Sequence, residues 1–237
     1  MTPEKLFNDI QAYCQANGDE ALVKKYSRYF KDGYDAYGLN HDKIVSKVKS
    51  VLDTPGADLD YIIRLGRLLI KSGKYEEVYM AVLMLQSFSK QFTIEVFEEL
   101  GHWFDIGIHN WAHTDYICGD LMQLFFKKKI IDFHYLSEWR TADNKFKRHA
   151  VPVSLIKQLK TTSDFQPFID FIEPMMMDPE REVHQGLGWF LREAWKKQPE
   201  PVELFLLKWK NKAPRLIFQY ATEKMTPEEK QRFRKEK

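Results

Sequence analysis

Apolar residues recur at helical spacing along much of the chain. The segments 78–88, 119–126 and 151–159 place apolar side chains three or four positions apart. No stretch shows the sustained alternation of apolar and polar residues, bounded by hairpin turns, that is typical of strands. The pattern therefore predicts an all-α fold. Glycine and proline predict loops or first helical turns at residues 54–56, 72–73, 173–174, 178–179 and 198–199.

Similar helix starts recur at a nearly constant interval. They fall at residues 76, 110, 144 and 181, which are 34, 34 and 37 residues apart, and a weaker fifth start lies near Lys212. An interval of this length holds a helix, a turn and a second helix, which is the unit of an α-solenoid. The Trp, Leu-Gly and Tyr signature of tetratricopeptide repeats is missing. We therefore predict an α-solenoid of HEAT-like helical repeats whose second helices line a concave groove.

Length and composition limit what such a fold can be. A chain of 237 residues, 44% of them apolar, can bury a large core, and one elongated domain or two small ones would fit. The regular repeat favours one domain over residues 1–237, with about 226–237 as a candidate flexible basic tail. We see no signal peptide and no apolar run of transmembrane length, so we expect a soluble cytoplasmic protein. Cys14 and Cys118 are most simply buried thiols.

The charge is unevenly distributed. Residues 181–237 contain 14 Lys and Arg against 8 Asp and Glu, a net charge of +6, so residues 1–180 carry −4 of the total +2. A nearly neutral total can conceal a basic face that binds a polyanion. The alternative is a solvated helix followed by a frayed basic end, and charge alone does not separate the two.

The most informative motif is an indole and a carboxylate on one helical face. Trp111 and Asp115 lie four residues apart, so on a helix they project from the same side about one turn apart. Aromatic rings normally face the core and carboxylates face water, so the pair indicates a working surface. Arg148 and Trp189 occupy equivalent places in the next two repeats. All four are expected to converge on one groove.

These residues resemble those of the HEAT-like-repeat DNA glycosylases of the AlkD type, which remove alkylated purines. The resemblance runs through nearly the whole chain. It rests on Trp-x-x-x-Asp at Trp111 and Asp115, on a single Arg in the following repeat at Arg148, and on the Gly-Trp-x-Leu-Arg-Glu segment at 188–193. Near the N-terminus, Arg-Tyr-Phe-Lys at 28–31 and Gly-Leu-Asn at 38–40 also resemble family motifs.

The resemblance implies roles for named residues. Tyr29 and Asn40 would face duplex DNA, Arg148 would grip a phosphate beside the lesion, and Arg192 and Arg215 would add affinity that is independent of sequence. Such enzymes are also expected to handle the lesion without flipping it into a deep pocket. The chain departs from the family pattern at Asn40, where the family has Gln, inside the Trp-x-x-x-Asp motif, and at Arg181 and Glu182, where the family has aromatic residues.

The expected chemistry follows from the charge of the substrate. An N3- or N7-alkylated purine is cationic and leaves without protonation, so the protein has to stabilise the positive charge that develops at C1′ of the sugar. A fixed carboxylate such as Asp115 does this and can orient or deprotonate water. The faces of Trp111 and Trp189 can hold a cationic sugar edge, at about 0.5–2 kcal/mol each when desolvated.

Each candidate also has a structural interpretation. Tryptophans on solenoid helices usually pack in the core, Asp115 could belong to a solvated face, and Arg148 could pair with a carboxylate of a neighbouring repeat. His109 and His113 form an H-x-x-x-H pair, but Asn110 stands where a zinc protease has its Glu and no third ligand follows at a recognisable distance. We therefore expect no metal and no cofactor.

Two main functions fit these observations. The first is a monofunctional DNA glycosylase, acting as a monomer on duplex DNA that contains alkylated purines, and nucleoid-associated when bound. The second is a non-catalytic HEAT-repeat protein that binds unusual or damaged DNA structures. A third, weaker possibility is a protein-binding HEAT scaffold. Retention of Trp111, Asp115 and Arg148 together favours the enzyme.

Overall fold

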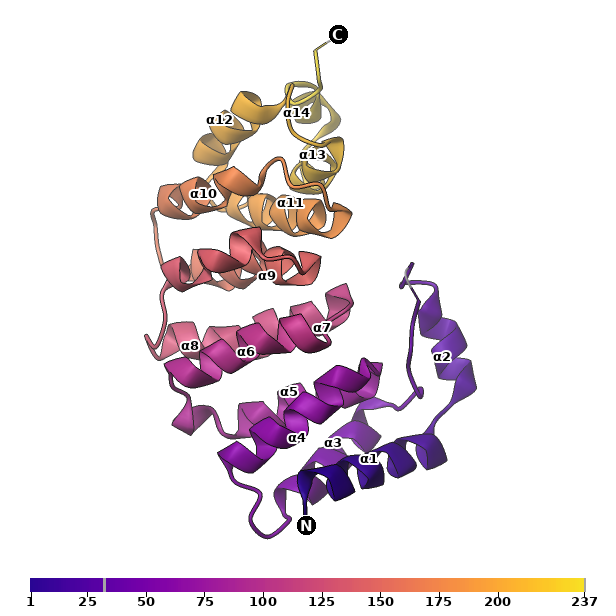
Figure 1. Ribbon diagram of the computed structural model, residues 1–237. Helices are drawn as coiled ribbons and strands as arrows, with labels where there is room; N and C mark the ends of the chain where they lie inside the picture. Colours follow the sequence, from indigo (N-terminus) through magenta and orange to yellow (C-terminus); the bar gives the residue numbers. More distant parts are fainter. Residues whose placement is uncertain (32, 237) are drawn as a thin grey trace. The chain divides into compact units, whose positions relative to one another are not determined.

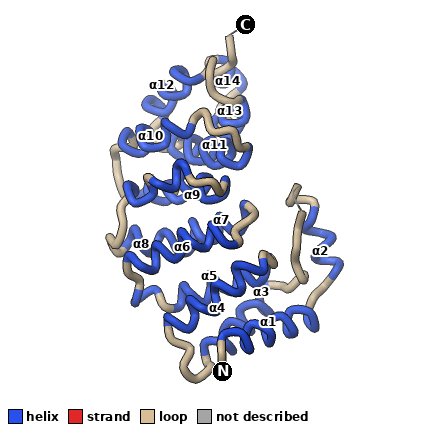
Figure 2. Tube along the Cα trace, viewed as in Figure 1, coloured by secondary structure: helices blue, strands red, loops and turns tan. Residues whose placement is uncertain are grey.

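The fold is helical throughout the described residues. The computed structural model describes residues 1–31 and 33–236, and within these ranges there are helices, turns and loops but no strand (Figure 2). This confirms the predicted all-α class. Across the same ranges, no helix combines the length and the apolar character that crossing a membrane requires.

Contacts between residues divide the chain into two compact units. Figure 1 labels their helices. The first unit, Met1–Ile130, holds its core mainly between α1, α4, α5 and α6. Its helices are α1 (Pro3–Asn17), α2 (Glu20–Ser27), α3 (His41–Leu52), α4 (Leu59–Ser72), α5 (Tyr75–Ser87), α6 (Ile94–Ile106), α7 (Trp111–Tyr116) and α8 (Met122–Lys127), with a 3₁₀ turn at Ser89–Gln91 and a π-helical turn at Ile117–Leu121.

The second unit, Ile131–Lys237, is organised around α11, which packs against α9 and α13. Its helices are α9 (Lys145–Leu155), α10 (Gln166–Ile172), α11 (Arg181–Trp195), α12 (Pro199–Trp209), α13 (Arg215–Ala221) and α14 (Pro227–Gln231), with 3₁₀ turns at Phe133–Leu136, Glu138–Thr141, Lys157–Lys160 and Glu173–Met175. The single domain over residues 1–237 stays a prediction.

The predicted helix starts agree closely with the structure. Helices α5, α7, α9, α11 and α13 begin at residues 75, 111, 145, 181 and 215, so successive starts are 34 or 36 residues apart. Two of these starts are fixed by asparagine. The side chain of Asn110 accepts a hydrogen bond from the backbone N–H of His113 at 2.9 Å, and that of Asn144 accepts from Phe146 at 2.8 Å. Each asparagine satisfies a backbone donor that has no partner within its helix.

The path from α7 to α8 is one helix interrupted by a π turn. Helix α7 ends at Tyr116, the π turn follows, and α8 begins at Met122. The sequence predicted a helix over 119–126 but not this irregularity. The predicted helix over 151–159 also differs in detail, because α9 ends at Leu155 and the chain tightens into a 3₁₀ turn.

Close helix packing in the second unit depends on glycine. A Cβ atom on Gly188 would lie 2.4 Å from Cβ of Tyr220 and 2.7 Å from the carbonyl oxygen of Ile217, so any side chain here would push α11 away from α13. Gly188 belongs to the Gly-Trp-x-Leu-Arg-Glu segment, and its role is therefore to let two helices approach closely.

The C-terminal segment contains regular structure. Thr226 and Glu229 form a capping box at the start of α14, and the side chain of Phe233 is 1% exposed. The guanidinium of Arg215 donates a hydrogen bond to the carbonyl oxygen of Phe233 at 2.9 Å. Residues 226–236, predicted as part of a candidate flexible tail, thus include a capped helix and a buried aromatic ring, while Lys237 lies outside the described residues. Cys14 and Cys118 are buried free thiols, as predicted.

Candidate active site

Helix α7 presents the predicted indole and carboxylate on one face. Trp111 is the first residue of the helix, directly after its cap Asn110, and 41% of its surface is exposed. Asp115 follows one turn later and is half-buried. The Trp-x-x-x-Asp spacing therefore places both residues as the sequence predicted, at the start of a helix rather than in its packed middle.

A cluster of aromatic rings surrounds this face. Trp111 stacks on Phe30 with ring centroids 5.3 Å apart, and Phe30 stacks in turn on Tyr34 at 4.5 Å. On the other side, Tyr116 stacks on Tyr79 at 4.1 Å. Stacked and edge-on arrangements of this kind fix ring orientations as well as burying apolar area. The rings that flank Trp111 come from the segment after α2, which is distant from α7 in sequence.

The cluster borders a cavity of about 660 Å³. This volume lies in the range of small-molecule and cofactor sites, and its lining is mostly aromatic and apolar. Four predicted site residues line it, namely Tyr29, Asn40, Trp111 and Asp115. They are joined by side chains from α2, α3, α5, α7 and the segment between α2 and α3: Leu22, Tyr26, Phe30, Tyr34, Gly38, Leu39, His41, Ile44, Tyr75, Tyr79, Ala112 and Tyr116.

Tyr29 and Asn40 are held differently. Tyr29 is 53% exposed, and its hydroxyl accepts a hydrogen bond from the guanidinium of Arg28 at 2.8 Å. Asn40 is also exposed, but its side chain caps α3 by accepting from the backbone N–H of Lys43 at 3.0 Å. Asn40 therefore has a structural task in addition to lining the cavity.

The structure adds a group of cations that the sequence reasoning did not assign. Lys24, Lys25, Arg28 and Lys31 are all exposed on and just after α2, next to two exposed tyrosines. The guanidinium of Arg28 lies 4.8 Å from the ring centre of Tyr29. The signal was present in the sequence, because residues 21–31 contain four cations, three aromatic residues and no acid. The positive charge of such a segment is complementary to the negative charge of a nucleic acid backbone.

His113 lies buried behind Trp111 and Asp115. Its ring stacks on Tyr75 at 5.4 Å, and one ring nitrogen, Nδ1, accepts a hydrogen bond from the amide of Asn110 at 3.0 Å. Burial lowers the pKa of His113 to about 3, although a hydrogen bond with the backbone of Tyr75 opposes the shift. The ring is therefore neutral at physiological pH and acts as packing beneath the site.

In the second unit, Arg148 is paired with a carboxylate. Its Nε and one terminal nitrogen donate to Asp178 at 2.6 and 3.2 Å, and its other terminal nitrogen donates to the carbonyl oxygens of Ala142 and Asp143. The side chains of Arg148 and Asp178 are 12% and 7% exposed. A two-point contact between guanidinium and carboxylate is the strongest ion-pair geometry in proteins, so Arg148 is held in place.

The remaining candidates of the second unit lie on α11 and α13. Trp189 is half-buried on α11. On the same helix, the guanidinium of Arg192 binds the carboxylates of Glu193 and Glu223. The guanidinium of Arg215 lies 4.5 Å from the ring centre of Phe218. The structure thus gathers Tyr29, Asn40, Trp111 and Asp115 in the first unit, and the convergence of the other residues with them stays a prediction.

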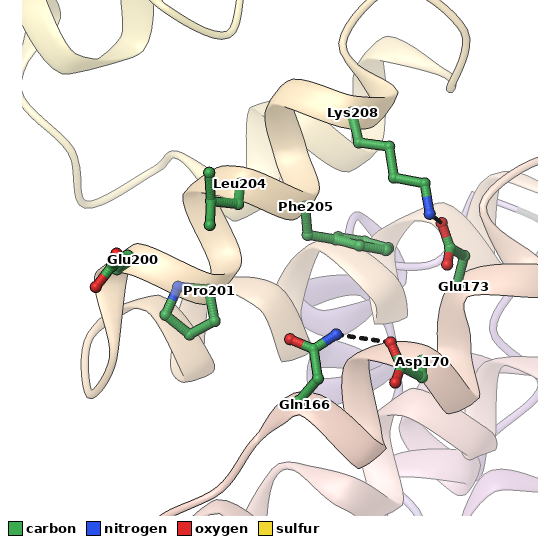
Figure 3. A pocket seen from close by; sticks show the side chains of 8 residues that line it. All are labelled: Gln166, Asp170, Glu173, Glu200, Pro201, Leu204, Phe205 and Lys208. Carbon is green, nitrogen blue, oxygen red and sulfur yellow. Dashed lines mark hydrogen bonds and ion pairs between the residues drawn. The ribbon is translucent and has the colours of Figure 1, made fainter.

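A second hollow lies between α10 and α12 (Figure 3). Its volume is about 410 Å³, and its polar lining includes Asp170, Glu173 and Glu200. The ammonium of Lys208 is bound to Glu173 at 2.5 Å, as Figure 3 shows. Because three carboxylates face one neutralised cation, this hollow is unsuited to a phosphate backbone.

The features described so far define a helical-repeat protein with an indole and a carboxylate at an aromatic cavity. Comparison with known proteins gives the family. The chain belongs to the DNA alkylation repair enzyme family, whose model matches residues 10–225. The predicted family resemblance is confirmed at this level. Among curated proteins, no match was found.

Solved structures share the fold. A predicted DNA alkylation repair enzyme from Enterococcus faecalis is 14% identical, with a TM-score of 0.72, covering 89% of this chain and 98% of that one. AlkD2 from Streptococcus mutans is 21% identical, with a TM-score of 0.59, covering 86% and 99%. The protein smu.31 from Streptococcus mutans UA159 is also 21% identical, with a TM-score of 0.57, covering 86% and 100%. At these identities the likeness establishes the helical-repeat fold.

Proposed function

We propose that this chain is a monofunctional DNA glycosylase that hydrolyses the N-glycosidic bond of N3- and N7-alkylated purines in duplex DNA. One observation supports it most strongly: in a member of the DNA alkylation repair family, Trp111 and Asp115 stand one helical turn apart and line the same aromatic cavity. Such a substrate implies an intracellular enzyme that acts on chromosomal DNA, and one chain supplies all the proposed site residues.

The proposed reaction needs no acid to activate the leaving group. Alkylation gives the purine a positive charge, so the bond from C1′ to the base breaks with both electrons moving to the base, which leaves neutral. The carboxylate of Asp115 stabilises the charge that develops on the sugar, and a water oxygen then bonds to C1′. The proton of that water passes to Asp115 and from there to solvent. The products are a free alkylpurine and an abasic site.

The aromatic residues and the cations have separate proposed roles. The indole of Trp111, and in the second unit that of Trp189, would hold the cationic sugar edge through their faces. The cations of α2 and its following segment, together with Tyr29 and Asn40, would bind the phosphate backbone. Arg192 and Arg215 would add further affinity. No cofactor or metal takes part in these steps.

Arg148 is proposed to contact one phosphate oxygen. A guanidinium has five N–H donors, and four of those of Arg148 are engaged by Asp178 and two carbonyl oxygens. A single N–H is therefore left for a phosphate, and the proposed contact is monodentate. Because Asp178 also offsets the charge of Arg148, Arg148 contributes more to fixing the position of the protein along the DNA backbone than to the affinity for DNA.

One alternative function uses the same surface. The exposed cations of α2 and its following segment, beside the aromatic cavity, would also suit a protein that binds damaged or unusual DNA structures without cleaving the glycosidic bond. This alternative and the enzyme differ in one measurable property, the release of free base.

The experiment uses duplex DNA with one N7-methylguanine. Wild-type protein, Asp115→Asn and Asp120→Asn are incubated with it, and free base is quantified. Asp120 is the next carboxylate along the chain, lies in the π turn that follows α7, and does not line the cavity. Release by the wild type and Asp120→Asn but not by Asp115→Asn supports the enzyme. No release by any of them, with tight salt-sensitive binding by all three, favours the non-catalytic DNA binder.

A further inference from the structure

Glu76 places a buried carboxylate against the main chain of the cavity wall. Its side chain belongs to the first turn of α5, and the residue is 1% exposed. Its two oxygens accept hydrogen bonds from three consecutive backbone N–H groups, those of Tyr37 at 2.9 Å, Gly38 at 2.7 Å and Leu39 at 3.0 Å. One side chain therefore binds the segment 37–39 at three points.

This arrangement makes the segment dependent on Glu76. A buried carboxylate is unfavourable unless hydrogen bonds compensate for lost hydration, and here three charge-assisted bonds do so. Removal of the carboxylate would leave three main-chain donors without an acceptor, and each such buried group destabilises its segment. A helix would satisfy these donors itself, but residues 37–39 are not helical.

The same segment also holds the start of α2. The carbonyl oxygen of Tyr37 accepts a hydrogen bond from the backbone N–H of Asp19 at 2.9 Å. Gly38 has a φ of +83°, and a Cβ atom there would lie 2.1 Å from the carbonyl oxygen of Asp19. The chain can therefore make this contact only with glycine at position 38.

None of the eight residues of helix α2 is fully buried, so contacts at its two ends contribute much of what holds it in place. One end is the contact of Asp19 with residues 37 and 38. The other is the stack of Phe30 and Tyr34 against Trp111 and Tyr75. The part of the cavity wall that comes from α2 and residues 30–39 is thus held by the Glu76 contacts and by ring stacking.

We propose that Glu76 is a positioning residue of the candidate active site, acting through the main chain of residues 37–39 to hold α2 and its tyrosines against the cavity. The proposal rests on the proposed function for its substrate. The hydrogen bonds of Glu76 go to the main chain of residues 37–39, so we expect it to govern how DNA is held rather than the reaction at C1′. A residue that only stabilises the fold would not change DNA binding selectively.

Asp35, in the same loop, also contacts α5 and its cap, and its substitution provides a milder variant. The backbone N–H of Tyr75 donates to the carbonyl oxygen of Asp35 at 2.8 Å, and the ammonium of Lys74 binds the carboxylate of Asp35, which is exposed. Asp35→Asn removes this ion pair at the surface without disturbing a buried group. It should therefore fold even where a change at Glu76 does not.

The experiment measures single-turnover release of N7-methylguanine at increasing protein concentration. Glu76→Gln keeps the size of the side chain but replaces one acceptor oxygen with an NH₂ donor. We expect the half-saturating concentration to rise about tenfold, with the rate at saturation within about threefold of wild type. Asp35→Asn should shift the same concentration by about twofold. Amide hydrogen exchange of residues 37–39 should be faster in Glu76→Gln.

Glu99→Gln is the matched control. Glu99 is also a buried carboxylate of the first unit, but it binds Arg67 and Trp103 and not the cavity wall. Comparable half-saturating concentrations for Glu76→Gln, Glu99→Gln and wild type would overturn the proposal. So would a loss in the saturated rate alone.

The role proposed for Glu76 can still be tested if the protein is not a glycosylase. If wild-type protein releases no base, the same variants are compared by their affinity for the undamaged duplex. A roughly tenfold weaker binding by Glu76→Gln alone would then support positioning of α2 in a DNA-binding protein. Equal affinities would overturn it.

Discussion

The rings of Phe30 and Trp111 are stacked with their planes 16° from parallel and their centroids 5.3 Å apart. Phe30 follows α2, whereas Trp111 begins α7, so the contact joins two distant parts of the sequence in one wall of the cavity. Because one face of the indole rests on Phe30, the orientation of Trp111 depends on a residue outside its own helix.

Replacement of Phe30 should therefore act on Trp111. We expect Phe30→Ala to weaken binding of damaged duplex by about tenfold, because an aromatic pair contributes about 0.5–1.5 kcal/mol beyond its buried area and the indole loses its support. Phe30→Tyr, which keeps the ring, should bind as wild type does. Fluorescence-anisotropy titration with labelled duplex measures both. Equal affinities for Phe30→Ala and Phe30→Tyr would contradict the expectation.

His113 should make the protein less stable in acid. Its pKa is lowered from 6.5 to about 3 in the folded state, so the unfolded chain binds a proton that the folded chain does not. The stabilising contribution is complete above pH 6.5 and decreases as pH falls from there to about 3. At pH 5.5 it should be smaller by about 1.4 kcal/mol.

Urea unfolding of wild type and His113→Phe at several pH values tests this dependence. The phenylalanine ring keeps the stack on Tyr75 but cannot take up a proton. The difference in unfolding free energy between the two proteins should change by about 1.4 kcal/mol between pH 7.5 and 5.5. A constant difference across this range would show that the ring titrates normally.

Opposite changes in DNA affinity are expected from the two partners of the Arg148 ion pair. Asp178→Asn removes the charge that offsets Arg148, so it should tighten binding and steepen the dependence of log K on log salt by roughly 0.9, the value for one phosphate. Arg148→Gln should weaken binding. Titrations at several salt concentrations give both quantities. Because Asp178 is buried, Arg148→Gln should also cost about 3 kcal/mol of stability. Weaker binding by Asp178→Asn would argue against a phosphate contact by Arg148.

The cations near α2 should bind DNA without regard to sequence. Combined replacement of Lys24, Lys25 and Lys31 by Gln should lower affinity for damaged and undamaged duplex by the same factor. The slope of log K against log salt concentration should become shallower by about 0.9 for each phosphate that the variant no longer neutralises. Lys90→Gln, an exposed lysine in the 3₁₀ turn after α5, serves as control. An effect confined to damaged DNA would instead place these lysines at the lesion.

Local signals in the sequence predicted much of this structure. Helix starts were readable because Asn110 and Asn144 cap them, and the shared face of Trp111 and Asp115 follows from helical spacing. The sequence predicted only that Arg148 could pair with a carboxylate of a neighbouring repeat, since no periodic signal connects it with Asp178, 30 residues later. Pairing of this kind is decided by how helices pack.

The cavity wall was the part of the structure that the sequence predicted least well. Phe30 and Tyr34 themselves lie outside regular structure, and Glu76 binds main-chain groups that have no side-chain signature. Gly38 was noted as part of a motif, but its left-handed conformation and its close approach to Asp19 are visible only in the structure. Only three-dimensional packing shows why these residues occur together.

The π turn at Ile117–Leu121 sets the rotational phase of two helical stretches. Each residue of an α-helix advances the side-chain direction by about 100°, and a π turn inserts about one residue more than the regular repeat requires. Trp111 and Asp115 can therefore face the cavity while Met122 and Phe125, beyond the turn, remain fully buried. Deletion of one residue here would make the helix regular and rotate one stretch relative to the other, so that either Asp115 turned away from the cavity or Phe125 left the core.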